Sequence, residues 1–165
     1  ASVPGSVIKA SHSGSSGSSP DAGNHGLGNV GTECTDPDTT QDEVFRYMQA
    51  ILRGDEIAVQ GDGTQSRDFI HASDVALAHL LAADSDDAVG RLFNVGTGVE
   101  TSINSLIGSI EKATGRRALT THEMWSSGDI YREYADTRRA GLTLGFTAEI
   151  PLHDGVRDLT RALND

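Results

Sequence analysis

A chain of 165 residues can form one ordinary domain with a hydrophobic core and leaves little for a second. Its net charge of −11 repels nucleic-acid phosphates and anionic membranes, so we expect neither as a partner. The single cysteine, Cys34, excludes an internal disulfide and a thiolate metal cluster. No apolar run reaches membrane-spanning length, so we expect a cytoplasmic protein.

Residues 1–40 are rich in glycine and serine and almost free of large apolar side chains. Such a segment buries too little surface to offset the entropy of ordering it, so we expect disorder here and a folded part over 41–165. The stretch GLGNVG at 26–31 matches the Gly-x-Gly-x-x-Gly pattern of dinucleotide sites. No strand pattern precedes it and no helical periodicity follows, so we interpret it as a chance match.

The first part of the folded region predicts a helix, a strand and a second helix. Residues 42–54 place Val44, Met48, Ile51 and Leu52 on one helical face, with Gly54 as the stop. A short strand is expected over 56–60, before the turn GDG, and another extended piece over 67–70. A helix follows over 73–84, with Ser73 or Asp74 as N-cap and an apolar face wide enough to indicate deep burial.

The second part continues the alternation of strands and helices. RLFNVGTG at 91–98 predicts a strand entering a glycine turn, and 101–115 is the clearest helix, closed by Gly115. YREYAD at 131–136 is a strand candidate, and Asp136 is expected to cap a brief helix through Arg139. An amphipathic helix begins near Pro151. This order of elements favours an α/β fold.

Five phrases in a fixed order carry a family resemblance: LRGDEIAVQGDGTQSRDFIHASDVALAHLLA, RLFNVGTG, GDIYREYADTRRA, LGF and PLHDGV. Together, over about 43–165, they resemble the C-terminal half of the extended short-chain dehydrogenase/reductases, the NAD-dependent epimerase/dehydratase family, with UDP-glucose 4-epimerases as the nearest type. The resemblance implies an incomplete Rossmann sheet with a small substrate-binding lobe. It also implies that NAD and the catalytic groups belong to an N-terminal half.

The resemblance implies four substrate-binding residues. Arg67 matches the arginine of the family's RDF phrase, which contacts the diphosphate of the nucleotide sugar, and a guanidinium fork suits phosphate oxygens. Gln60 lies where the chain passes the nucleotide base, and many relatives carry an aromatic residue there. Asp129 matches the acid of the RPGD phrase, whose arginine is replaced here by Ser126. Asn29 falls at the offset of a substrate-side asparagine.

The family's acid/base pair, a tyrosine followed four positions later by a lysine, does not occur in this sequence. The lysine lowers the pKa of the tyrosine, so the pair is needed for the chemistry. We therefore expect no catalytic residues, no NAD bound by this chain alone and only weak binding of a nucleotide sugar. A missing Rossmann half or a homodimer is the expected partner. Positions 51, 135 and 138, four after the three tyrosines, hold Ile51, Ala135 and Arg138.

Other interpretations stay open at this stage. A non-catalytic binding or assembly module is one alternative, and a related sugar-nucleotide dehydratase or decarboxylase is another, because the residues that discriminate these reactions are not in the sequence. Arg67 could also be a structural partner of Asp68 or Asp74. The six histidines have no metal-ligand spacing, so no metal site is expected.

Overall fold

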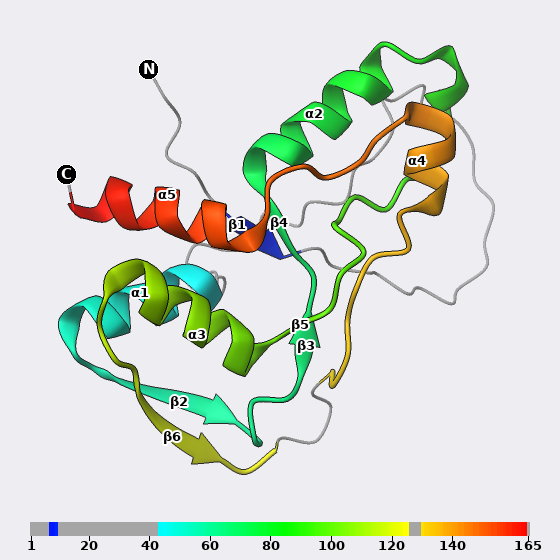
Figure 1. The fold of residues 1–165 in the computed structure, drawn as a ribbon. Helices are drawn as coiled ribbons and strands as arrows, with labels where there is room; N and C mark the ends of the chain where they lie inside the picture. The colour runs from blue at the N-terminus through cyan, green and yellow to red at the C-terminus, as the bar shows by residue number, and fades with distance from the viewer. Residues whose placement is uncertain (1–6, 10–42, 126–129, 165) are drawn as a thin grey trace.

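The computed structural model describes residues 7–9, 43–125 and 130–164. The buried apolar side chains of these residues form two hydrophobic clusters. The larger cluster takes residues from three helices, α1 (Glu43–Arg53), α3 (Ile103–Thr114) and α5 (Leu152–Asn164). The smaller cluster takes residues from α2 (Ala72–Ala83) and α4 (Arg138–Leu144). In Figure 1, the first three helices lie on one side of β4 (Phe69–His71), and α2 and α4 lie on the other. The candidate site is built where the segments connecting these clusters meet.

Three helices and a two-stranded sheet enclose the larger cluster. Helix α1 (Glu43–Arg53) lies beside α3 (Ile103–Thr114), which packs on α5 (Leu152–Asn164). Beneath them, β2 (Glu56–Gln60) pairs in parallel with β6 (Leu119–Glu123), as Figure 1 shows. Helix α1 buries residues spaced by three and four, so its apolar stripe faces the core. The buried residues are Val44, Tyr47, Met48 and Ile51, whereas Leu52 is only partly buried.

The smaller cluster joins short elements from the middle and the end of the chain. Strand β4 (Phe69–His71) runs antiparallel to β1 (Val7–Lys9) and continues directly into α2 (Ala72–Ala83). A 3₁₀ turn, η1 (Asp86–Ala88), and helix α4 (Arg138–Leu144) pack beside α2. Ile70, Phe146 and Leu144 are among the residues buried between these elements.

The second helix differs from its prediction in its cap and in its burial. His71 is the N-cap, and its Nδ1 accepts a hydrogen bond from the Ser73 backbone N–H at 3.2 Å. Asp74 is instead turned inward, where its carboxylate accepts from the backbone N–H groups of Glu149 and Ile150. The predicted deep burial is wrong, because Leu80 is 68% exposed. Only Val75 and Ala78 are buried among the apolar residues of α2, so the helix packs on one side only.

Two further predictions are corrected by the backbone. Residues 91–98 form no strand, and their last residues are bound by the carboxylate of Asp68 instead of a neighbouring strand. Residues 131–136 contribute one isolated bridge, between Arg132 and Ser66, in place of a strand. Strand β6 has no counterpart among the sequence predictions, because all five of its residues are exposed and carry no alternating apolar pattern.

The remaining helix predictions hold. Helix α3 begins after the N-cap Ser102 and ends at Gly115, whose φ of 68° is the left-handed conformation that favours glycine. Helix α5 follows Pro151 directly. Helix α4 is longer than expected and begins after Thr137, although Asp136 Oδ1 does accept from the Arg138 backbone N–H at 3.1 Å. Among the described residues, no helix is long and apolar enough to cross a bilayer.

Strand Val7–Lys9 lies inside the segment expected to be disordered, and the rest of that segment lies outside the described residues. GLGNVG is among the residues not described. The division at residue 40 therefore stays a prediction.

Candidate functional site

An open groove of about 410 Å³ lies where β3 (Ser66–Arg67) pairs antiparallel with β5 (Thr101–Ser102). Hydroxyl groups and one arginine–glutamate pair supply most of its lining. It therefore offers hydroxyl, carboxylate and guanidinium groups that could hydrogen-bond a ligand. The lining residues are Thr64, Ser66, Glu100, Ser102, Ser105, Tyr131 and Arg132.

The guanidinium of Arg67 lies at β3 and is held by the main chain. Its Nη1 donates to the Ser66 carbonyl oxygen at 2.9 Å and to the Ile130 carbonyl oxygen at 2.8 Å. Its Nε lies 3.7 Å from Glu133 Oε2, and the two side chains are only 11% and 8% exposed. Arg67 is thus a fixed, nearly buried cation whose charge partner is Glu133.

Asp68 and Asp74, the two acids considered as partners of Arg67, bind backbone groups instead. Asp68 is fully buried and accepts from the N–H groups of Thr97 and Gly98 at 3.0 and 2.9 Å. Asp74 accepts from the backbone N–H of Ile150 at 3.0 Å. The interpretation of Arg67 as an ion-pair partner of either acid is therefore wrong, and the observed partner is sixty-six positions further along the chain.

Gln60 lies at the end of β2, immediately before the GDG turn, and its side chain is exposed. Its carbonyl oxygen accepts from Gln65 Nε2 at 2.8 Å, which closes the loop over 60–65. The indole of Trp125 packs over Gly61, where an added Cβ would lie 2.8 Å from Cε3. An aromatic side chain therefore does lie beside this turn, although Gln60 itself is not aromatic.

The GDG turn is fixed by short hydrogen bonds. Asp62 Oδ1 accepts from the Thr64 backbone N–H at 3.0 Å, and hydrogen bonds from Thr64, led by its side chain, lower the pKa of the Asp62 carboxyl. Asn104 Nδ2 donates to the Asp62 carbonyl oxygen at 2.9 Å. At Gly63 an added Cβ would lie 2.2 Å from Asn104 Oδ1, so only glycine fits this position, where φ is 75°.

A second arginine–glutamate pair lies in the groove. Arg132 Nε donates to Glu100 Oε2 at 2.8 Å, its Nη2 contacts the other carboxylate oxygen, and Ser66 Oγ also donates to Oε2 at 2.9 Å. The hydrogen bond from Arg132 lowers the pKa of the Glu100 carboxyl. Across the groove, Tyr131 shares a 2.7 Å hydrogen bond with the Thr64 hydroxyl, and its ring meets Trp125 edge-on at 5.7 Å.

Helix α1 brings a buried phenol into the electrostatic range of Arg67. Burial raises the pKa of Tyr47, the charge of Glu43 raises it further, and the charges of Arg46 and Arg67 oppose this effect. The Arg46 guanidinium also lies 5.0 Å from the centre of the Tyr47 ring. Tyr47 is thus a residue of the larger hydrophobic cluster within range of the charge of Arg67, and it does not line the groove.

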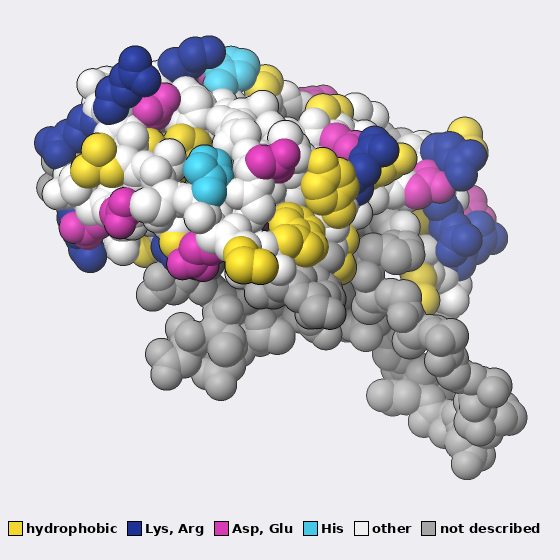
Figure 2. All heavy atoms as spheres, turned by 90° about the horizontal axis from the view of Figure 1, so that it is seen from below, with side chains coloured by type: hydrophobic (Ala, Val, Ile, Leu, Met, Phe, Trp, Pro, Cys, Tyr) yellow, Lys and Arg dark blue, Asp and Glu magenta, His cyan; other side chains and the backbone are white. Residues whose placement is uncertain are grey.

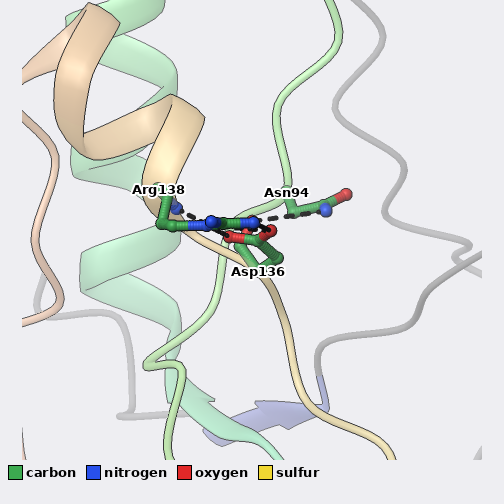
Figure 3. A network of polar contacts seen from close by, with 3 residues as sticks. All are labelled: Asn94, Asp136 and Arg138. Atoms are coloured by element: carbon green, nitrogen blue, oxygen red, sulfur yellow. Dashed lines mark hydrogen bonds and ion pairs between the residues drawn. The ribbon is translucent and has the colours of Figure 1, made fainter.

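A third polar cluster lies away from the groove, at the start of α4. The Arg138 guanidinium faces the Asp136 carboxylate, and Asn94 Nδ2 donates to the Asp136 carbonyl oxygen at 3.4 Å (Figure 3). Hydrogen bonds from the Arg138 side chain and then from the Arg138 backbone N–H lower the pKa of Asp136 to about 2. The cluster fastens 91–98 to the entrance of α4.

Of the predicted site residues, Arg67 follows the groove-lining Ser66 and Gln60 lies at the end of β2, and neither of them lines the groove itself. Asp129 and Asn29 lie outside the described residues. Sequence reasoning missed Glu133, Glu100 and Arg132. Their contacts span 32 or more positions, and no local spacing signals such pairs.

The face that contains β2 and β6 carries little concentrated positive charge. Figure 2 shows its Lys and Arg side chains mainly towards the two ends, with acidic and hydrophobic side chains between them. Exposed apolar side chains flank 126–129, among them Met124 and Ile130, which are 92% and 53% exposed. Recognition of a phosphate by the described residues would therefore depend on individual arginines.

The described residues contain neither a metal cluster nor a glycine-rich turn between a strand and a helix. They contain no group of three or more His, Cys, Asp or Glu side chains that could hold a metal. Helices α2 and α3 follow strands β4 and β5 directly, without the glycine-rich turn that places a pyrophosphate on a helix N-terminus. We therefore derive no step through NAD, and its absence from this chain alone stays a prediction.

Comparison with known proteins begins with a family model. The model of the NAD dependent epimerase/dehydratase family matches residues 28–96. A UDP-glucose 4-epimerase of Mycolicibacterium smegmatis is 33% identical over 121 residues, which are 73% of this chain and 38% of that protein. The bifunctional UDP-glucose 4-epimerase and UDP-xylose 4-epimerase 3 of Arabidopsis thaliana is 32% identical over 148 residues, 82% of this chain and 41% of that protein.

The chain belongs to the NAD-dependent epimerase/dehydratase family. Among solved structures, MoeE5 in complex with UDP-glucuronic acid and NAD matches with a TM-score of 0.67 and 37% identity. The match covers 73% of this chain and 41% of MoeE5. The α/β fold and the family resemblance predicted from the sequence are thereby confirmed. This member of the family spans about two fifths of the length of the curated relatives that it matches.

Proposed function

We propose that this chain is the substrate-binding, C-terminal part of a nucleotide-sugar epimerase or dehydratase and that it binds the diphosphate of a UDP-sugar beside Arg67. The proposal rests on the position and the hydrogen bonds of Arg67. Arg67 stands in the phrase RDF, directly after Ser66, which lines the groove, and its guanidinium is fixed by two main-chain carbonyls. Solved relatives contain UDP-glucuronic acid and UDP-glucose together with NAD, which supports a nucleotide sugar as the ligand.

The geometry of Arg67 suits an anion ligand. A guanidinium has five N–H donors, and here Nη1 is used for the Ser66 and Ile130 carbonyls. Among the described residues, Nη2 makes no hydrogen bond, so that side of the fork could meet a phosphate oxygen. Because the side chain is already ordered, little rotamer entropy is lost on binding.

Hydride transfer would require groups that this chain does not contain. Its two lysines, Lys9 and Lys112, do not follow a tyrosine at the spacing of the family's acid/base pair. We propose that the incomplete Rossmann sheet implied by the resemblance is completed by another part of a longer enzyme or by a separate chain. On this proposal the chain alone binds UDP-sugars weakly and has no epimerase turnover.

Calorimetry with UDP-glucose tests the proposal directly. Arg67→Gln is expected to weaken binding about tenfold, the effect of losing one charge-assisted contact. Arg157→Gln, on the exposed side of α5, removes the same charge and should leave the Kd unchanged. Arg67→Lys keeps the charge without the fork and should lie between them. Equal Kd values for Arg67→Gln and the unaltered chain would refute the role of Arg67. Tight binding of NAD to this chain would refute the proposal that NAD binds to another part of the enzyme.

A non-catalytic assembly module is the second candidate, and exposed apolar side chains favour it. Leu80, Leu142 and Met124 are 68%, 90% and 92% exposed. On this alternative the chain associates through such surfaces and binds no nucleotide sugar. Light scattering that shows a monodisperse monomer would count against it.

A further inference from the structure

The positive charge of Arg67 is already neutralised inside the protein. Glu133 Oε2 lies 3.7 Å from Arg67 Nε, and both side chains are about nine-tenths buried. Charges that are shielded from water attract one another more strongly than exposed ones, because solvent screens them less. A phosphate that approaches Arg67 therefore meets an ion pair and not an isolated cation.

The backbone of Glu133 is bound next to Arg67. The Glu133 N–H donates to the Ser66 carbonyl oxygen at 3.1 Å, and the Ser66 N–H donates to the Tyr131 carbonyl oxygen at 2.9 Å. These two bonds fix the backbone of Glu133 beside β3, so the carboxylate can leave Arg67 only by a rotation of its side chain. The pair is thus built into the main-chain pairing of the site.

Arg132, which lines the groove, does not supply an unpaired positive charge either. Arg132 is bound by both carboxylate oxygens of Glu100. Two arginines and two glutamates among the described residues of the site sum to zero charge, in a chain whose net charge is −11. Position 126, where the family resemblance expects another arginine, is a serine.

We propose that Glu133 limits the affinity of Arg67 for diphosphates, because a diphosphate can engage Arg67 fully only when it displaces the Glu133 carboxylate. This inference rests on the proposed function, since it takes Arg67 as the diphosphate ligand. It makes Glu133 a residue that sets affinity through Arg67 without contacting the ligand. It also assigns the ligand class: the charge of Glu133 lowers the affinity for a nucleoside diphosphate and leaves the affinity for a nucleoside without phosphate unchanged.

The test compares UDP with uridine on three proteins by calorimetry. Glu133→Gln removes the negative charge while preserving shape, and we expect UDP to bind at least fivefold more tightly than to the unaltered chain. Uridine affinity should not change. Asp158→Asn removes one carboxylate from the exposed Asp158–Arg161 pair of α5 and should change neither affinity. A purely structural role of Glu133 would alter both ligands alike or weaken UDP binding.

A second variant provides the test if Glu133→Gln does not fold. If circular dichroism shows Glu133→Gln to be unfolded, Glu133→Asp keeps the charge and withdraws it by one methylene, and a smaller gain in UDP affinity is expected. If UDP binds the unaltered chain and the folded variant shows an equal or weaker affinity, the inference is overturned and the proposed function stands. If UDP binds neither protein, both fail.

Discussion

The carboxylate of Asp68 accepts a hydrogen bond from the backbone N–H of Gly98 at 2.9 Å, across thirty positions of sequence. The same side chain accepts from the N–H groups of Thr97 and Ala135, at 3.0 and 3.2 Å. One buried carboxylate, from the residue between β3 and β4, therefore binds the turn at 96–98 and the segment that enters α4. This explains how 91–98 keeps a defined course without belonging to a sheet.

Asp68→Asn is expected to destabilise the fold by about 2–4 kcal/mol, since an amide nitrogen would face backbone donors and leave buried N–H groups unpaired. Urea denaturation measures the change. Asp158→Asn, on the exposed face of α5, is the control and should stay within about 0.5 kcal/mol. Equal effects of the two substitutions would contradict the role given to Asp68.

Gly96→Ala tests how tightly the turn closes on Asp68. An added Cβ would lie 2.6 Å from Asp68 Oδ2 and 2.6 Å from the Ala135 Cβ, so both neighbours would have to move. We expect a loss of about 1–3 kcal/mol.

Gly108→Ala is the matched substitution for Gly96→Ala. It lies inside α3 with nothing within 4 Å of the added Cβ, and it should stabilise the chain by up to about 1 kcal/mol through helix propensity. Thermal unfolding of the two variants should therefore move in opposite directions. A common direction would argue against the close packing at Gly96.

The Asp136–Arg138 pair predicts a specific acid titration. The folded pKa of Asp136 is about 2, below its ordinary value of 3.8, so the carboxylate is favoured in the folded state. Its contribution to stability is present above pH 3.8 and is lost as the pH falls through about 2. Carboxyl NMR should show the pKa returning towards 3.8 in Arg138→Gln and unchanged in Arg157→Gln. If the pKa of Asp136 stays at about 2 in Arg138→Gln, then Arg138 does not cause the shift.

Leu80→Ala and Leu106→Ala make the same chemical change at opposite exposures. Leu106 is fully buried in α3, and its truncation should cost about 2–5 kcal/mol through lost burial and a cavity. Leu80 is 68% exposed on α2, so the cost should be below about 0.5 kcal/mol. Chemical denaturation compares them. A large loss at Leu80 would indicate that a partner covers this side of α2.

Helices α1, α3 and α5 and strand β2 could be predicted because their signals are local. The three- and four-residue spacing of Val44, Met48 and Ile51 identifies a buried helical face without any knowledge of its partner. Ser102 and Gly115 mark the ends of α3 for the same reason, since a cap acts within one turn.

The burial of α2 could not be predicted, because apolar residues around a helix do not say how many of its sides are covered. Its cap was misassigned because Asp74, a good N-cap residue, binds Glu149 and Ile150 far along the chain, and this leaves His71 in its place.

The sequence by itself determined the periodic helices, the family phrases and Arg67 as the candidate ligand of a phosphate. Only the tertiary structure decided that Arg67 faces Glu133, that Arg132 is held by Glu100, and that Asp68 binds a turn. Periodicity and capping act over a few residues and can be read locally. Ion pairs and buried carboxylates depend on which distant segments the folded backbone brings together, and no spacing encodes that.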